Sequence, residues 1–118
     1  MKILVIEDEA FIAALLAETL DDLGHDVCAI AATEADAVAA AHEHLPDLII
    51  ADASLTEGSG TNAVATILTT RPVAHVFVTG NASAVRAQLP NAIILQKPFF
   101  LPELEAAITA ALLAPTTA

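Results

Sequence analysis

Chemically active side chains, namely carboxylates, a hydroxyl and an ammonium, stand within two residues after the ends of four short apolar runs of the chain. The set consists of Glu7, Asp8, Asp52, Thr79 and Lys97. The runs that precede them cover residues 2–6, 48–51, 73–78 and 93–95. Short continuous apolar runs of this kind are typical of strands buried on both faces of a parallel sheet. Because solubility does not require a polar residue at the end of a buried strand, the recurrence at four places indicates one shared site.

The charges of this set limit the chemistry that it can perform. Two carboxylates ~4 Å apart repel each other by ~4 kcal/mol at an effective dielectric constant of ~20, so three of them need a counter-ion. Lys97 supplies one positive charge, and a divalent cation would supply the rest. Since Cys and His are absent from these positions, Mg²⁺ or Mn²⁺ is favoured over Zn²⁺. A carboxylate beside such an ion, with an ammonium and a hydroxyl nearby, can attack phosphorus.

The elements that must hold these side chains alternate between strand and helix. A further strand is expected over residues 27–30, and helices over residues 12–23, 34–44, 61–70, 83–89 and 102–112. Gly24 and Thr33 stand where a helix C-terminal cap and an N-cap belong, and Pro102 suits the first position of a helix. Five alternations predict an α/β fold, an open parallel sheet with helices on both faces. The ligand crevice of such a sheet lies beyond the carboxyl ends of its strands.

Three of the expected helices carry an apolar stripe at helical spacing. The predicted stripes are Ile12, Leu15, Leu16, Leu20 and Leu23 in the first helix, Ala35, Val38, Ala41, His42 and Leu45 in the second, and Leu104, Ile108, Ala111 and Leu112 in the last. These faces are expected to cover the sheet. The tail from residue 115 to residue 118 is expected to be frayed.

Length and composition restrict the class of protein. The 118 residues form one expected domain, 1–118, and their 56% hydrophobic content excludes disorder. A net charge of −11 argues against direct binding to nucleic acid or to an anionic membrane. No apolar run approaches the ~20 residues that cross a bilayer, and no signal peptide is recognised. The single cysteine, Cys28, cannot form an internal disulfide, in keeping with a cytoplasmic protein.

The combined pattern resembles the receiver domain of bacterial two-component response regulators over essentially the whole chain. The resemblance rests on the pair Glu7-Asp8, on Asp52, on Thr79 and on the segment Lys97-Pro98-Phe99. It implies a flavodoxin-like fold with strand order 2-1-3-4-5 and a cis peptide bond between Lys97 and Pro98. It also implies cytoplasmic phosphorelay signalling by a monomer or weak homodimer.

The resemblance assigns a role to each site residue. Asp52 would be the phosphoacceptor, and Thr79 and Lys97 would contact the phosphoryl group. Mg²⁺ would be held by Asp8 and Asp52, by Glu7 directly or through water, and by the backbone carbonyl of Ser54. The phosphoryl donor would be a sensor histidine kinase or a histidine phosphotransfer protein. The chain would not be an enzyme, beyond self-phosphorylation and self-dephosphorylation at Asp52.

The sequence also departs from the receiver pattern. Ile94 stands where receivers usually carry the aromatic residue of the switch, so the readout is expected from the backbone at residues 79–81. After the acceptor, the usual Leu-Pro and Asp-Gly pairs are replaced by Leu55-Thr56 and Ser59-Gly60. The segment from Phe77 to Asn81 resembles the Phe-Ala-Thr-Gly motif of a stand-alone receiver subgroup, the FAT GUY regulators.

Two alternative functions remain open from the sequence. A pseudo-receiver would keep the fold as a protein-interaction module without phosphotransfer, and the complete set of five polar residues argues against it. A phosphatase with an aspartate nucleophile, of the haloacid-dehalogenase type, would need a second aspartate two residues after Asp52. That position is Ser54, which argues against the phosphatase.

Overall fold

A central five-stranded parallel sheet organises the computed structural model of the chain, which describes residues 1–114. The strand order is β2-β1-β3-β4-β5, as expected. Along the chain the elements are β1 Lys2–Ile6, α1 Ala10–Asp22, β2 Asp26–Ala31, α2 Glu34–His44, β3 Leu48–Asp52, α3 Gly60–Leu68, β4 Ala74–Thr79, α4 Ala82–Gln88, β5 Ile94–Gln96 and α5 Leu101–Leu113. The expected tail at 115–118 lies outside the described residues. None of the helices found in 1–114 has the length and apolarity to span a membrane.

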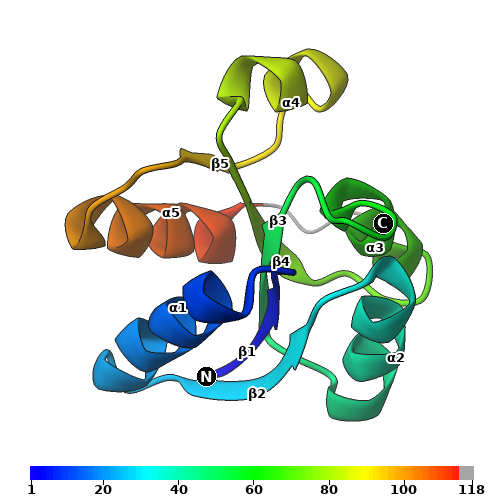
Figure 1. The fold of residues 1–118 in the computed structure, drawn as a ribbon, viewed down its shortest axis with the longest axis horizontal. Helices are drawn as coiled ribbons and strands as arrows, with labels where there is room; N and C mark the ends of the chain where they lie inside the picture. Colours follow the sequence, from blue (N-terminus) through cyan, green and yellow to red (C-terminus); the bar gives the residue numbers. More distant parts are fainter. Residues whose placement is uncertain (115–118) are drawn as a thin grey trace.

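The helices divide between the two faces of the sheet, with α1 and α5 on one side and α2 and α3 on the other (Figure 1). Helix α4 follows β4 at the β5 edge and adds Val85 to the cluster formed with α2 and α3. The second cluster unites Leu20 of α1 with Leu104 and Ile108 of α5. The inner strands supply residues to both clusters because they are covered on both faces. This sandwich fixes the carboxyl ends of β1, β3, β4 and β5 along one edge of the sheet.

The caps explain where several helices begin and end. The hydroxyls of Thr33 and Ser59 accept hydrogen bonds from the backbone N–H groups of Asp36 and Asn62, at 3.1 and 3.0 Å, and so start α2 and α3. Gly24 follows α1 with a φ of +89°, which confirms its expected place after the helix. Pro102 is the second residue of α5, not the first, since the helix begins at Leu101. The bounds of β1 and α2 are those expected, and the other element bounds differ from the expected ones by at most two residues.

All three predicted stripes include a large apolar residue that is exposed. In α2 the buried residues are Ala37 and Ala41, while Leu45 is exposed. Alanine-rich helices carry small apolar residues on several faces, so the pattern does not single out the one that packs. In α5 the core contacts come from Leu104, Ile108 and their neighbours, while the side chain of Leu112 is half exposed.

Helix α1 is set apart from α5 by a groove. The groove encloses about 610 Å³ and is lined mainly by apolar side chains, including Ile12, Leu15 and Leu16 of α1 and Phe99 and Leu104. This explains why Leu15 is exposed although it belongs to the predicted stripe. At one end the groove reaches the carboxyl ends of the strands, where Glu7, Asp52 and Lys97 also line it.

Candidate functional site

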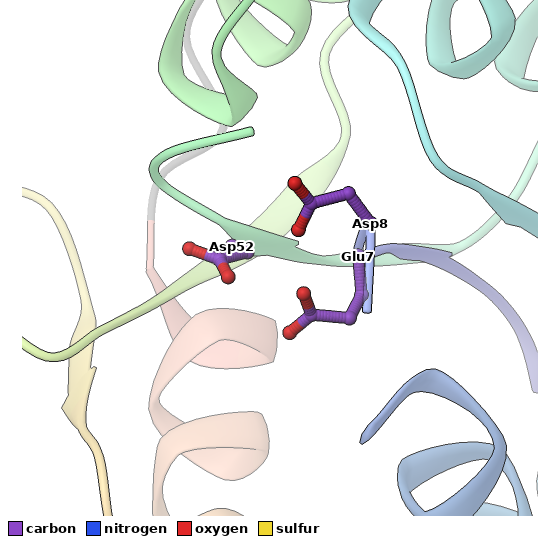
Figure 2. A group of neighbouring side chains, drawn as sticks. All are labelled: Glu7, Asp8 and Asp52. Carbon is purple, nitrogen blue, oxygen red and sulfur yellow. The ribbon is translucent and has the colours of Figure 1, made fainter. Parts of the chain in front are cut away.

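Three carboxylates meet at the carboxyl ends of β1 and β3. Glu7 and Asp8 follow β1 directly, and Asp52 is the last residue of β3. Each offers one oxygen that lies within 4.8 Å of the oxygens offered by the other two. Figure 2 shows their side chains projecting to the same side of the strand ends. The pairing of Ile6 with Ala51 in neighbouring strands brings the two acidic segments into this register.

Lys97 is the positive partner of this cluster. Its Nζ lies 2.9 Å from Asp52 Oδ2 and 3.1 Å from Glu7 Oε1, so one ammonium bridges two carboxylates. The residue follows β5, and its backbone N–H donates to the carbonyl oxygen of Thr79 at 2.8 Å. The peptide bond from Lys97 to Pro98 is cis, as the resemblance implied. The positive charge expected from Lys97 therefore lies against two of the three carboxylates, Asp52 and Glu7.

Burial and hydrogen bonding give these groups different pKa values. Glu7 is only 4% exposed, and burial raises the pKa of its carboxyl despite hydrogen bonds from the Glu9 N–H and from Lys97. Burial by itself would lower the pKa of Lys97, but the hydrogen bonds to Asp52 and Glu7 raise it. The Lys97 ammonium thus stays protonated and available to an anionic group throughout the neutral range.

Asp8 is held from outside the cluster. Its Oδ2 accepts hydrogen bonds from Thr56, at 2.7 Å from the backbone N–H and at 2.5 Å from the hydroxyl. Both hydrogen bonds lower the pKa of Asp8 from its ordinary value of 3.8, and the bond from the hydroxyl has the larger effect. Thr56 lies in the loop between β3 and α3, and sequence reasoning did not single it out as a partner of Asp8.

We expect this contact to make the protein sensitive to acid. Because the pKa of folded Asp8 lies below the ordinary 3.8, ionised Asp8 stabilises the fold above that pH. The contribution is lost as the pH falls through the lower pKa. Carboxyl ¹³C titration by NMR should therefore give a lower midpoint for Asp8 than for Glu7, whose pKa is raised. An Asp8 midpoint at or above the ordinary 3.8 would show that the Thr56 contact is absent in solution.

The remaining expected residues border the cluster. Thr79 ends β4, is buried, and accepts a hydrogen bond on its hydroxyl oxygen from the Asn81 N–H at 3.0 Å. It lines a hollow together with Ser54 and Asn81. Ser54 N–H donates to Asp52 Oδ1 at 3.1 Å, which fixes the orientation of the Asp52 carboxylate. The expected role of the Ser54 carbonyl as a metal ligand stays a prediction.

Sequence reasoning also missed Gln96, the residue before Lys97. Its side-chain oxygen accepts from the Ala82 N–H at 2.9 Å, and its amide nitrogen donates to the Gly80 carbonyl at 2.8 Å. Gln96 therefore clamps the loop between β4 and α4, which is the loop expected to change on activation. Ile94, the replacement of the switch aromatic, is half buried and packs against the core on the α2 and α3 side. The sequence offered one signal for Gln96: it is a polar residue two positions after Ile94, which replaces the aromatic residue of the switch.

The donor set suits a hard divalent cation. Three carboxylate oxygens are the ligands that Mg²⁺ takes in proteins, usually together with several waters. The cluster is built at the same edge as Lys97 and Thr79, so a phosphoryl group bound there would meet positive charge and hydrogen-bond donors. The arrangement can therefore support attack by a carboxylate on phosphorus with charge neutralisation on the transferred group.

Comparison with known proteins agrees with this geometry. Residues 3–109 match the family described as the response regulator receiver domain. The phyllosphere-induced regulator PhyR of Methylorubrum extorquens is 38% identical over 115 residues, which cover 94% of this chain and 43% of PhyR. The transcriptional regulatory protein PdtaR of Mycobacterium tuberculosis is 33% identical over 111 residues, which cover 91% of this chain and 54% of PdtaR. The chain thus spans about half the length of these curated relatives.

Solved structures give the same result. The solution structure of the receiver (REC) domain of the Erythrobacter litoralis PhyR response regulator aligns with a TM-score of 0.88 and 32% identity, covering 99% of this chain and 95% of that one. The anti-anti-sigma factor PhyR of Bartonella quintana aligns with a TM-score of 0.81 and 31% identity over 95% of this chain and 46% of that one. With the parallel sheet, the acidic cluster and the bridging lysine in place, the chain belongs to the response regulator receiver domain family.

Proposed function

We propose that the chain is the phosphoacceptor of a two-component phosphorelay, with Asp52 as the residue that receives the phosphoryl group. The observation that carries the proposal is the position of the Asp52 carboxylate, which ends β3 beside two further carboxylates and lies 2.9 Å from the Lys97 ammonium. The donor would be a phosphohistidine, on a sensor kinase or on a histidine phosphotransfer protein. Signalling through such a switch does not require the chain to turn over a substrate.

The transfer itself is a single displacement at phosphorus. An oxygen of ionised Asp52 forms the new bond to phosphorus, and the bond from phosphorus to the donor's imidazole nitrogen breaks. The imidazole leaves with the electron pair and takes up a proton. Lys97, released from its pairing with the free Asp52 carboxylate, neutralises a phosphoryl oxygen. Thr79 donates a hydrogen bond to another once its hydroxyl turns toward the group.

Mg²⁺ is the cation that we assign to the acidic cluster. Glu7, Asp8, Asp52 and the Ser54 carbonyl would hold it, and it would neutralise negative charge that builds up on the transferred group. The three side chains fit this assignment because their oxygens converge within 4.8 Å. Without added charge, phosphorylation would place a dianionic group next to two carboxylates, which electrostatic repulsion opposes.

The readout is proposed to run through the loop from Thr79 to Asn81. If the Thr79 hydroxyl turns toward the phosphoryl group, the Asn81 N–H loses the acceptor that now holds it. Ile94 is stiff at χ1 and has no ring to rotate, so it does not replace the usual aromatic. Gln96 holds the same loop at Gly80 and Ala82, and we expect phosphorylation to move this segment to a second arrangement.

The output of the whole protein is a separate question. PhyR of Bartonella quintana is an anti-anti-sigma factor, and PdtaR of Mycobacterium tuberculosis is a transcriptional regulatory protein. This chain corresponds to about half of each, so we extend to it only the receiver step that they share. The resemblance to stand-alone FAT GUY regulators, carried by the Phe77 to Asn81 segment, stays a prediction, as does one receiver domain over 1–118.

The experiment that tests the proposal is phosphoryl transfer from a histidine-phosphorylated donor protein. Labelled donor and chain are mixed with Mg²⁺ or with EDTA, and label on the chain is followed over time. We expect rapid, Mg²⁺-dependent transfer to a product that is labile in base, as acyl phosphates are. A pseudo-receiver would take up no label from any donor, which would contradict the proposal.

We expect the same assay to detect donor docking through Phe11. This side chain is 80% exposed on the first turn of α1, next to the acidic cluster. A protein donor that reaches Asp52 must cover this edge, and exposed aromatic residues are common anchors of interfaces. Phe11→Ala should slow transfer from the protein donor by about tenfold without changing the rate with a small phosphodonor.

Leu113→Ala is the matched control for Phe11→Ala. Leu113 is 81% exposed but ends α5, so it lies far along the helix from the acidic cluster. Its replacement should leave both rates unchanged. An equal loss with protein and small-molecule donors in Phe11→Ala would contradict a docking role, because it would place the defect in the site itself.

A further inference from the structure

The contact between Thr56 and Asp8 joins the acidic cluster to the loop that follows β3. Asp8 Oδ2 accepts from the Thr56 N–H at 2.7 Å and from the Thr56 hydroxyl at 2.5 Å. A carboxylate oxygen offers two lone pairs, so these donors saturate Oδ2. Both are hydrogen bonds to an ionised acceptor, which are stronger than bonds between neutral groups. A cation at the cluster must therefore use the other oxygen of Asp8 or displace Thr56.

The same loop is held independently at its other end. The Ser59 N–H donates to Glu34 Oε1 at 3.1 Å, and the Glu34 N–H donates to the Glu57 carbonyl at 3.2 Å. Gly58, between these two contacts, has a φ of +86° and leaves no room for a side chain against Glu34. Releasing Thr56 would thus free the middle of the loop while its end stays attached to α2.

We propose that Thr56 is a built-in competitor of the divalent cation for Asp8. It would lower the affinity of the acidic cluster for the cation and would make cation binding loosen the middle of the loop. The inference rests on the proposed function, because it takes the cation site as given. A proline at this place, as in the usual Leu-Pro pair of receivers, would have neither an N–H nor a hydroxyl to donate, so the competition depends on Thr56.

The direction of the effect follows from charge. Each hydrogen bond from Thr56 stabilises ionised Asp8 and draws part of its negative charge away from the cluster. A cation that binds Asp8 weakens both bonds or breaks them, so part of its binding free energy is lost. Removing a donor should tighten cation binding and, in metal-free buffer, should destabilise the fold. Competition thus predicts tighter cation binding together with a less stable fold. General damage to the structure would instead lower both the affinity for the cation and the stability of the fold.

The test compares the parent chain with Thr56→Val, which loses the hydroxyl and keeps the backbone N–H. Mg²⁺ alone is titrated and followed by amide NMR shifts, because the chain has no Trp or Tyr to report binding. We expect the dissociation constant of Thr56→Val to fall by about threefold to tenfold, while its midpoint in metal-free urea unfolding also falls. Hydrogen exchange at the amide of residue 56 in the parent chain should become faster when Mg²⁺ is added.

Two further variants keep the result interpretable. Thr56→Ser retains both donors and should bind Mg²⁺ like the parent. Thr66→Val makes the same chemical change on the exposed face of α3 and should leave affinity unchanged. An equal or weaker affinity in Thr56→Val would overturn the competitor role and leave the proposed function intact. A parent chain that binds no Mg²⁺ at all would contradict both the competitor role of Thr56 and the proposed function.

Discussion

Replacing Asp52 by Asn is expected to abolish labelling of the chain by a phosphohistidine donor while the fold is retained. The amide that replaces the carboxylate carries no negative charge, so it can neither attack phosphorus nor form an acyl phosphate. The fold survives because the new side chain has the same shape, and its oxygen can still accept from the Ser54 N–H. Lys97 keeps Glu7 as a partner at 3.1 Å. Label on the chain and far-UV circular dichroism measure the two effects.

Asp36→Asn is the control for this change. Asp36 is exposed on the first turn of α2, and its replacement removes the same charge away from the acidic cluster. It should be labelled at the parental rate. Label on Asp52→Asn at a comparable rate would show that another residue is the acceptor, and the role proposed for Asp52 would be wrong.

The second large effect is expected at Gly60, the first residue of α3. A Cβ added there would lie 1.8 Å from the carbonyl oxygen of Asp52. Because this oxygen belongs to the backbone, the end of β3 would have to move. Overpacking of buried positions typically costs 1–3 kcal/mol, and the rigid backbone contact places Gly60→Ala at about 2 kcal/mol or more. Urea unfolding followed by circular dichroism measures the change in the free energy of unfolding.

Gly80 provides the matched glycine control. A Cβ at this position meets no atom within 4 Å, and its φ lies outside the region that favours glycine. Gly80→Ala should therefore change the free energy of unfolding by no more than about 0.5 kcal/mol. If Gly60→Ala proved as stable as Gly80→Ala, the close approach of α3 to Asp52 would not exist in solution. The displaced β3 end should also slow phosphorylation of Gly60→Ala, which the labelling assay detects.

The sheet and the acidic cluster could be predicted because each depends on local sequence signals. Short apolar runs define the strands, and a parallel sheet brings their carboxyl ends to one edge. Asp8, Asp52 and Lys97 therefore fall together once the strand order is known. A neutralising role for Lys97 beside the carboxylates was expected on charge alone. The additional contact to Glu7 required the burial of that side chain, which no spacing rule gives.

The loops could not be predicted in the same way. Thr56 reaches Asp8 across 48 positions of sequence, and Gln96 reaches the Gly80 loop across 16. Such contacts depend on how each loop leaves its strand, and neither periodicity nor capping patterns encode this. Similarly, the stripe on α1 was recognised from spacing, yet Leu15 faces the groove beside α5 and stays exposed. A stripe indicates an apolar face but not whether a neighbour covers it.

The most direct test of the central claim locates the phosphoryl group on the chain. The chain is phosphorylated in Mg²⁺ and then reduced with borohydride, which converts an aspartyl phosphate to homoserine. Peptide mass spectrometry identifies the converted residue. We predict homoserine at position 52, at none of the other six aspartates, and no reduced side chain at any of the eight glutamates. Conversion at Asp8 instead, or a stable phosphate on a serine, threonine or histidine with Asp52 intact, would contradict the account.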